Sequence, residues 1–195
     1  MVKLAAQIEG IGLLGPGLDG WTGSVALLEG RSPYIPQPTV LPVPDGLPPA
    51  ERRRIGRVVK LALGVGLQAL SKAGLDPAAL PAVFASSGGD GHNCHEICQA
   101  LSLDDRMISP TRFHNSVHNA PSGYWGIATR SREAVTSVSC FDASFGAGLL
   151  EAARQFGCDL LSMGAYSHSR LRQLILGGVT RHVLENSTLP VMMSR

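Results

Sequence analysis

Residues 134–153 read AVTSVSCFDASFGAGLLEAA, a β-branched strand that leads into a helix rich in Ala, Leu and Gly. The turn between such a strand and helix exposes its side chains and places them beside free backbone amides and the positive end of the helix dipole. Enzymes use this position for an activated nucleophile, because these groups lower the pKa of a thiol. Here the turn carries the acid Asp142, and the thiol of Cys140 lies two positions earlier.

The patterns on both sides of this stretch alternate between strand and helix. Short apolar runs predict strands over residues 3–14, 81–87, 134–140, 159–164 and 189–193. Periodicity and capping residues predict helices over 19–28 (capped by Asp19), 50–72 (ended by Gly74), 92–101, 109–129 (broken or kinked at Pro121), 141–156 and 171–184. The prolines of residues 33–49 predict an extended surface segment. This alternation favours an α/β fold with mainly parallel strands.

The composition of the 195 residues excludes several classes of protein. Hydrophobic residues at 44% and charged residues at 16% are typical of a globular chain. The net charge is +2 and the longest basic run covers residues 52–54, which argues against nucleic-acid binding. Polar residues interrupt every apolar run, so we expect no membrane span. Four cysteines without a secretory signal predict a reduced, cytoplasmic protein.

The glycines at 88, 89 and 91 come before a predicted helix, where backbone amides favour an anion. The stretch matches neither the dinucleotide fingerprint nor a P-loop. A tight turn that packs a helix on a sheet is the alternative.

The helix predicted over 92–101 carries the metal-type ligands His92, Cys94, His95, Glu96 and Cys98. A zinc site usually takes further ligands from a second element, and no matching element is evident. Buried thiols on a core-facing helix are the favoured alternative, and we predict no metal.

His114 and His118 lie four residues apart, so a continuous helix over 109–129 would place them on one face. Such a pair could relay a proton or bind a ligand. A polar helix face at a subunit contact is an equally good interpretation.

Residues 8–155 resemble the N-terminal half of the β-ketoacyl synthases. Within that family they are most similar to the chain length factors that accompany aryl-polyene-type polyketide synthases. The resemblance is carried by residues 8–17, 49–54, 83–91, 109–119 and 142–144.

This resemblance implies a thiolase-like fold in which Asp142 stands where the acyl-accepting cysteine belongs. A carboxylate cannot form the required thioester, so the resemblance implies a non-catalytic protein that pairs with a ketosynthase and an acyl carrier protein, as a homo- or hetero-dimer. Cys140 is the alternative acyl acceptor, but a displacement of roughly 6–7 Å along a strand would remove it from the oxyanion-stabilising amides. The histidines of an active synthase come from a C-terminal half that we expect to be missing.

From about residue 157 the chain resembles the C-terminal part of a universal stress protein, over residues 158–172, 175–184 and 189–191. In that family a glycine-rich motif binds ATP phosphates, and the matching positions here are Gly164, Ser167, Gly177, Gly178, Val179 and Thr180. Ser167 and Gly178 depart from the motif, so we predict no cofactor, with ATP as the alternative.

The two resemblances predict a synthase-like domain over residues 1–155 and a βαβ fragment over 156–195, whose strands either dock beside the first domain or hang loosely. Three functions follow: a non-catalytic synthase partner, an ATP-binding stress-response module, or a residual acyltransferase that uses Cys140. A decayed fusion without activity is the remaining interpretation.

Overall fold

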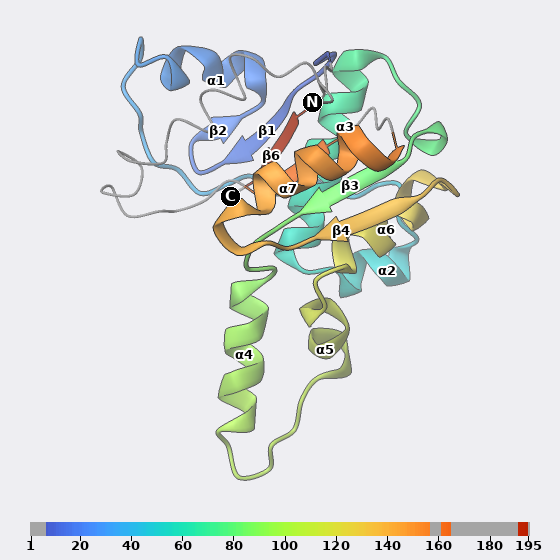
Figure 1. Ribbon diagram of the computed structural model, residues 1–195. Helices are drawn as coiled ribbons and strands as arrows, with labels where there is room; N and C mark the ends of the chain where they lie inside the picture. Colours follow the sequence, from blue (N-terminus) through green and yellow to red (C-terminus); the bar gives the residue numbers. More distant parts are fainter. Residues whose placement is uncertain (1–6, 157–160, 165–190, 195) are drawn as a thin grey trace.

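The computed structural model describes residues 7–156, 161–164 and 191–194, and a six-stranded sheet runs through it (Figure 1). The strand order is β2-β1-β6-β5-β3-β4. The strands are β1 (Gly12–Gly15), β2 (Leu18–Asp19), β3 (Ala82–Ala85), β4 (Val135–Val138), β5 (Leu161–Gly164) and β6 (Val191–Ser194). Neighbouring strands are parallel except for β1 and β2. The predicted α/β fold with mainly parallel strands is therefore confirmed.

The two strands from the predicted C-terminal fragment lie in the middle of this sheet. β6 pairs with β1 through Gly12 and Met192, and β5 pairs with β3 through Val83 and Leu161. These strands thus join the two halves of the sheet, so of the two predicted arrangements the structure has the docked one. The helix predicted over 171–184 lies outside the described residues, and the division at residue 155 stays a prediction.

Helices cover both faces of the sheet. The helices of the described residues are α1 (Trp21–Leu28), α2 (Pro49–Arg54), α3 (Arg57–Ala73), α4 (Gly91–Leu101), α5 (Pro110–Ser116), α6 (Ala120–Thr129) and α7 (Ser144–Glu151), with the short helical turns η1 (Pro77–Ala79), η2 (Phe141–Ala143) and η3 (Ala152–Phe156). α3 and α6 pack on one face and α7 on the other (Figure 1). Residues 29–48 contain no helix or strand, as their prolines predict.

Two helices predicted as continuous are each divided in two. The helix predicted over 50–72 is interrupted at Ile55 and Gly56, which are both extended. Ile55 is buried in the core cluster. The Asn115 side chain donates a hydrogen bond of 2.7 Å to the carbonyl of Arg54. A distant side chain therefore satisfies the last carbonyl of α2, which a continuous helix would have bonded itself.

The helix predicted over 109–129 is interrupted at residues 117–119, because Val117 is extended. Pro121 then falls in the first turn of α6, where a missing amide proton costs nothing. The predicted cap of α1 is also wrong: Gly20 precedes the helix, and no side chain caps it. Gly74 ends α3 in the left-handed conformation, as predicted.

The core lies on both faces of the sheet because successive residues of a strand point to opposite sides. In β3, Ala82 and Phe84 join the cluster beneath α3 and α6, whereas Val83 and Ala85 join the cluster beneath α7. Trp125 of α6 is completely buried, and its ring meets that of Phe84 edge to face at 5.9 Å. Burial on both faces is typical of a parallel sheet covered by helices.

α3 crosses β1 at very short range. A side chain at Gly12 would collide with the backbone carbonyl of Val65, and one at Gly10 with that of Ala69. Glycine is therefore required at both positions for this helix to lie directly on the strand.

α4 and α5 project from the sheet and its covering helices as an arm, which we define as residues 90–117 (Figure 1). The Asp90 carboxylate caps α4 by accepting a hydrogen bond of 3.0 Å from the Asn93 amide. The Asn93 side chain donates to the carbonyl of Arg112 at 2.7 Å, and the Arg112 guanidinium pairs with Glu96 at 2.9 Å. Polar contacts thus link the two helices of the arm.

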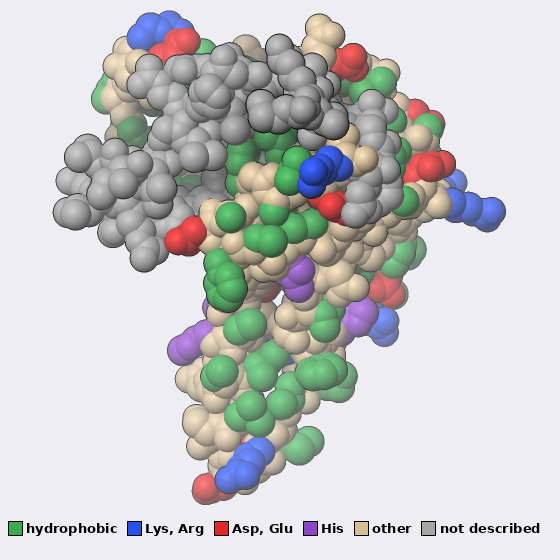
Figure 2. Space-filling view, viewed as in Figure 1, with side chains coloured by type: hydrophobic (Ala, Val, Ile, Leu, Met, Phe, Trp, Pro, Cys, Tyr) green, Lys and Arg blue, Asp and Glu red, His purple; other side chains and the backbone are tan. Residues whose placement is uncertain are grey.

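The surface of the arm exposes several large apolar side chains among polar and charged ones (Figure 2). Its exposed large apolar side chains are Leu101, Leu103, Met107, Phe113 and Val117. Cys94 and Cys98 are also exposed, so the prediction of buried thiols on a core-facing helix is wrong: α4 faces solvent and buries only Asn93.

Candidate functional site: the strand-to-helix turn and a neighbouring pocket

The predicted strand-to-helix turn is present between β4 and α7, and a buried serine organises it. The Ser144 hydroxyl accepts a hydrogen bond from the Cys140 amide at 2.9 Å and donates one to the Phe141 carbonyl at 2.7 Å. The Ala143 amide donates to the Cys140 carbonyl at 2.9 Å. Phe141 adopts a positive φ of 48°, which is costly for a bulky residue. The turn is therefore a fixed structure.

Asp142 lies in the middle of this turn, and Cys140 lies two residues beyond β4, directly before η2; both are exposed. The Cys140 amide proton is already donated to Ser144, so it cannot help to stabilise an oxyanion at the same time. The turn presents a carboxylate where a nucleophile would be exposed. The roles of both residues stay predictions.

The structure separates the two candidate histidines. α5 ends at Ser116, so His118 lies beyond it and does not share a helix face with His114. The His118 ring is partly buried, and its Nε2 has no hydrogen-bond partner among the described residues. His114 is exposed, and its ring meets that of Tyr124 edge to face at 5.8 Å. The predicted placement of the two histidines on one helix face is therefore wrong, because Val117 breaks the helix.

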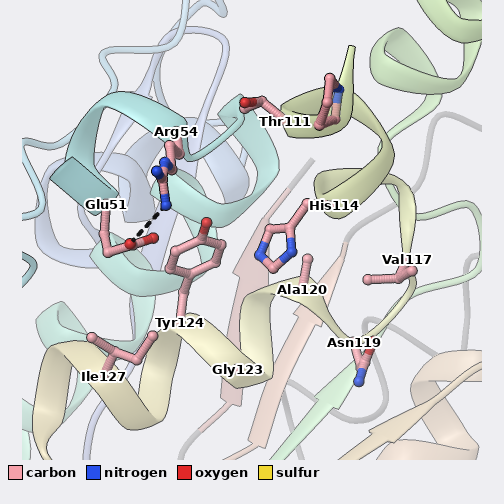
Figure 3. A pocket seen from close by; sticks show the side chains of 11 residues that line it. Glu51, Arg54, Thr111, His114, Val117, Asn119, Ala120, Gly123, Tyr124 and Ile127 are labelled. Carbon is pink, nitrogen blue, oxygen red and sulfur yellow. Dashed lines mark hydrogen bonds and ion pairs between the residues drawn. The ribbon is translucent and has the colours of Figure 1, made fainter. Parts of the chain in front are cut away.

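A pocket of about 640 Å³ lies where α2, α5 and α6 meet (Figure 3). Its polar lining comes from Glu51, Arg54, Thr111, His114, Asn119 and Tyr124, and its apolar lining from Pro110, Val117, Ala120 and Ile127. Of these residues the sequence singled out only His114. The pocket exists because both predicted helices are broken, so continuous helical patterns gave no signal for it.

The Tyr124 phenol is the most buried polar group of this pocket. The residue is 3% exposed, and its hydroxyl makes no hydrogen bond of normal geometry in the part of the chain that the structure describes. Burial raises the pKa of Tyr124, and the nearby Glu51 carboxylate raises that pKa further through its charge and as an acceptor for the phenol, whereas the Arg54 charge lowers it. The phenol therefore keeps its proton at neutral pH and can act as a hydrogen-bond donor.

The remaining candidate sites are the metal-type ligands of α4, the glycine-rich turn before α4 and the ATP-binding positions. Within residues 7–156, 161–164 and 191–194 no three His, Cys, Asp or Glu side chains gather as they would around a metal. Asp90 occupies the start of α4, so the glycine-rich turn before it serves as a capped helix entry and not as an anion site. Gly164 ends β5, and the other ATP candidates (Ser167, Gly177, Gly178, Val179 and Thr180) lie outside the described residues.

Comparison with known families assigns most of the chain. The model of the β-ketoacyl synthase N-terminal domain matches residues 29–159, about two thirds of the sequence. The chain belongs to this family. The match includes the turn at 140–144, the arm and the pocket.

Solved structures agree with this assignment. A ketosynthase in complex with its chain length factor, from Xenorhabdus doucetiae, matches with a TM-score of 0.67 and 25% identity, over 89% of this chain and 73% of that one. A β-ketoacyl synthase from Burkholderia phymatum matches with a TM-score of 0.60 and 14% identity, over 91% of this chain and 50% of that one.

A ketosynthase in complex with the acyl carrier protein of a type II polyketide synthase matches with a TM-score of 0.62 and 14% identity, over 90% of this chain and 55% of that one. The chain thus spans about half the length of these last two proteins. At 14% identity both show the fold alone.

The C-terminal part of the chain has a second similarity. The universal stress protein family model matches residues 127–195. A universal stress protein from Synechocystis is 49% identical over 37 residues, which is 19% of this chain and 13% of that protein. The two family matches overlap at residues 127–159.

Within the described residues, no helix is both long and apolar enough to cross a bilayer. The cytoplasmic location stays a prediction.

Proposed function

We propose that this protein is a non-catalytic, chain-length-factor-like partner of a ketosynthase in polyketide or fatty acid assembly. The observation that carries the proposal is Asp142 in the turn between β4 and α7. Condensation needs a thiolate that forms a thioester, and a carboxylate at that position does not provide one. The turn therefore exposes position 142 as an active synthase would expose its nucleophile, but the side chain there is a carboxylate.

The exposed apolar side chains of the arm support pairing with another subunit. Phe113 on α5 and Met107 in the loop between α4 and α5 are both largely exposed there. Large exposed apolar groups gathered on one surface mark interaction sites. β4 is also an edge strand of the sheet, next to the turn, and an edge strand offers unpaired backbone groups. The similarity to a ketosynthase–chain length factor complex supports a ketosynthase as the partner.

Co-expression with a ketosynthase from the same genome, followed by size exclusion with light scattering, tests the pairing. We expect a heterodimer. Phe113→Asp should weaken it about tenfold or more, as loss of a central apolar contact does. Ile35→Asp is the matched control, because Ile35 and Phe113 are both 63% exposed and only Phe113 lies on the arm. Two separate species, or equal effects of the two substitutions, would overturn pairing through the arm.

Intact mass spectrometry after incubation with an acyl-pantetheine thioester tests the non-catalytic role. We expect no acyl adduct on the free chain or on the complexed chain. An adduct that Cys140→Ser removes would instead establish the acyltransferase alternative, since Cys140 is exposed beside the turn.

The stress-protein similarity of residues 127–195 supports a second candidate, an ATP-binding module. Titration with a fluorescent ATP analogue tests it. Saturable binding that Gly177→Asp abolishes would support the module, and a flat titration would exclude it.

A further inference from the structure

We propose that the pocket between α2, α5 and α6 binds a small carboxylate with an apolar body. This site is separate from the turn at 140–144, which contributes no residue to it. Its volume of about 640 Å³ lies within the roughly 300–1,000 Å³ of pockets that hold small molecules.

The Tyr124 hydroxyl makes no hydrogen bond of normal geometry within the described residues, although the Glu51 carboxylate lies near enough to attract its proton. The residue is buried and keeps its proton, and its hydroxyl points into the pocket toward Arg54 (Figure 3). A buried donor without a partner costs about 1–3 kcal/mol. A ligand oxygen in the pocket would accept a hydrogen bond from this hydroxyl and remove that cost.

Arg54 supplies the charge that selects a carboxylate among oxygen ligands. Within the described residues its guanidinium donates a hydrogen bond of 3.3 Å to Glu51, and a guanidinium has five N–H donors. The remaining donors form a planar fork that suits both oxygens of a carboxylate. His114 adds a third polar side chain beside the Tyr124 ring.

Glu51 places a limit on the affinity. Its carboxylate shares the Arg54 counter-ion with the ligand, and like charges at this range repel each other. Loss of the Glu51 charge should therefore strengthen binding, whereas loss of the Arg54 charge should weaken it. If Glu51 and Arg54 only supported the structure, the two substitutions would not change ligand affinity in opposite directions.

The rest of the pocket fixes the shape of the ligand. Pro110, Val117, Ala120 and Ile127 form an apolar wall, which suits a hydrocarbon or aromatic body. The pocket is held open before binding, because the Asn115 amide ties the Arg54 carbonyl (2.7 Å) to the Thr111 carbonyl (2.9 Å). A preformed pocket lowers the ordering cost of binding.

Titration of the full chain by NMR, with phenylacetate as the probe, tests this site. We expect saturable shifts confined to α2, α5 and α6. Phenylacetamide and phenylethanol keep the ring without the charge and should bind at least about tenfold more weakly. Equal affinity for the three compounds, or no saturable shift with phenylacetate, would overturn the proposal.

Three variants locate the binding groups, each checked by its melting temperature so that unfolding is excluded. Tyr124→Phe and Arg54→Gln should each weaken phenylacetate binding about tenfold, and Glu51→Gln should strengthen it about threefold. Unchanged affinity in folded Tyr124→Phe, or weaker binding by Glu51→Gln, would contradict the assignment. The result does not depend on ketosynthase pairing, since the probe is titrated into the chain alone.

Discussion

The sheet with its covering helices and the arm are held together by different forces. Around the sheet, helices pack through buried apolar side chains such as Leu63, Val65 and Trp125. In the arm, α4 and α5 are linked by an amide-to-carbonyl hydrogen bond and an ion pair. The apolar side chains of the arm point outward instead.

This difference separates a region that stabilises itself from one suited to a partner. Apolar burial contributes most of the free energy of folding, and polar links between exposed helices contribute little. An arm with few buried apolar contacts should open locally before the sheet unfolds. Covering its exposed apolar side chains with another subunit would stabilise both the arm and the complex.

The largest expected effect is on the sheet side of this comparison. Trp125→Ala removes a fully buried ring that packs on Phe84 and should lower the free energy of unfolding by about 3–5 kcal/mol. Chemical denaturation measures this loss. Leu103→Ala on the arm, at a residue 57% exposed, is the control and should change stability by no more than about 0.5 kcal/mol. Similar losses in both variants would mean that the arm is part of the core.

An intermediate effect is expected where the two helices of the arm are linked. Asn93→Ala leaves the Arg112 carbonyl without its donor and should destabilise the arm by about 1–3 kcal/mol. Hydrogen exchange should become faster in α4 and α5 and remain unchanged in α3. Gln99→Ala, at an exposed position of α4, should leave both rates unchanged. Faster exchange in α3 would show that the arm and the sheet unfold as one unit.

The smallest effect is expected at the ion pair of the arm. Glu96 and Arg112 are partly exposed, so Glu96→Gln should lower arm stability by at most about 1 kcal/mol. A double-mutant cycle with Arg112→Gln, followed by hydrogen exchange, measures the coupling, and high salt should reduce it. A coupling that equals the Asn93 effect would show that charge, rather than the buried amide, holds the arm.

Local patterns predicted where most of the strands lie along the chain, because β-branched and apolar runs can be recognised without knowing their distant partners. The regions around 81–87 and 134–140 both formed parallel strands. The break at Ile55 was not predictable in the same way, since the group that satisfies the Arg54 carbonyl lies 61 residues further along, at Asn115. Helical periodicity contains no record of such a contact.

The candidate sites also differ in whether a single stretch of sequence could predict them. The turn that presents Asp142 and Cys140 follows from one continuous stretch of sequence, and it was predicted at its observed place. The pocket at Tyr124 brings together three helices, so no single motif signals it. The exposure of Cys94 was not predicted, because the residue pattern of a helix does not show whether the helix packs on the core or projects in an arm.

The position of β5 and β6 at the centre of the sheet governs the order of assembly. β1 and β3 have no direct pairing and are joined only through strands made much later, up to Ser194. During synthesis β1 and β3 therefore keep unpaired backbone edges until those late residues leave the ribosome. Contacts between residues so far apart in the chain slow folding. The partly folded chain that lacks β5 and β6 is the species that chaperones would bind.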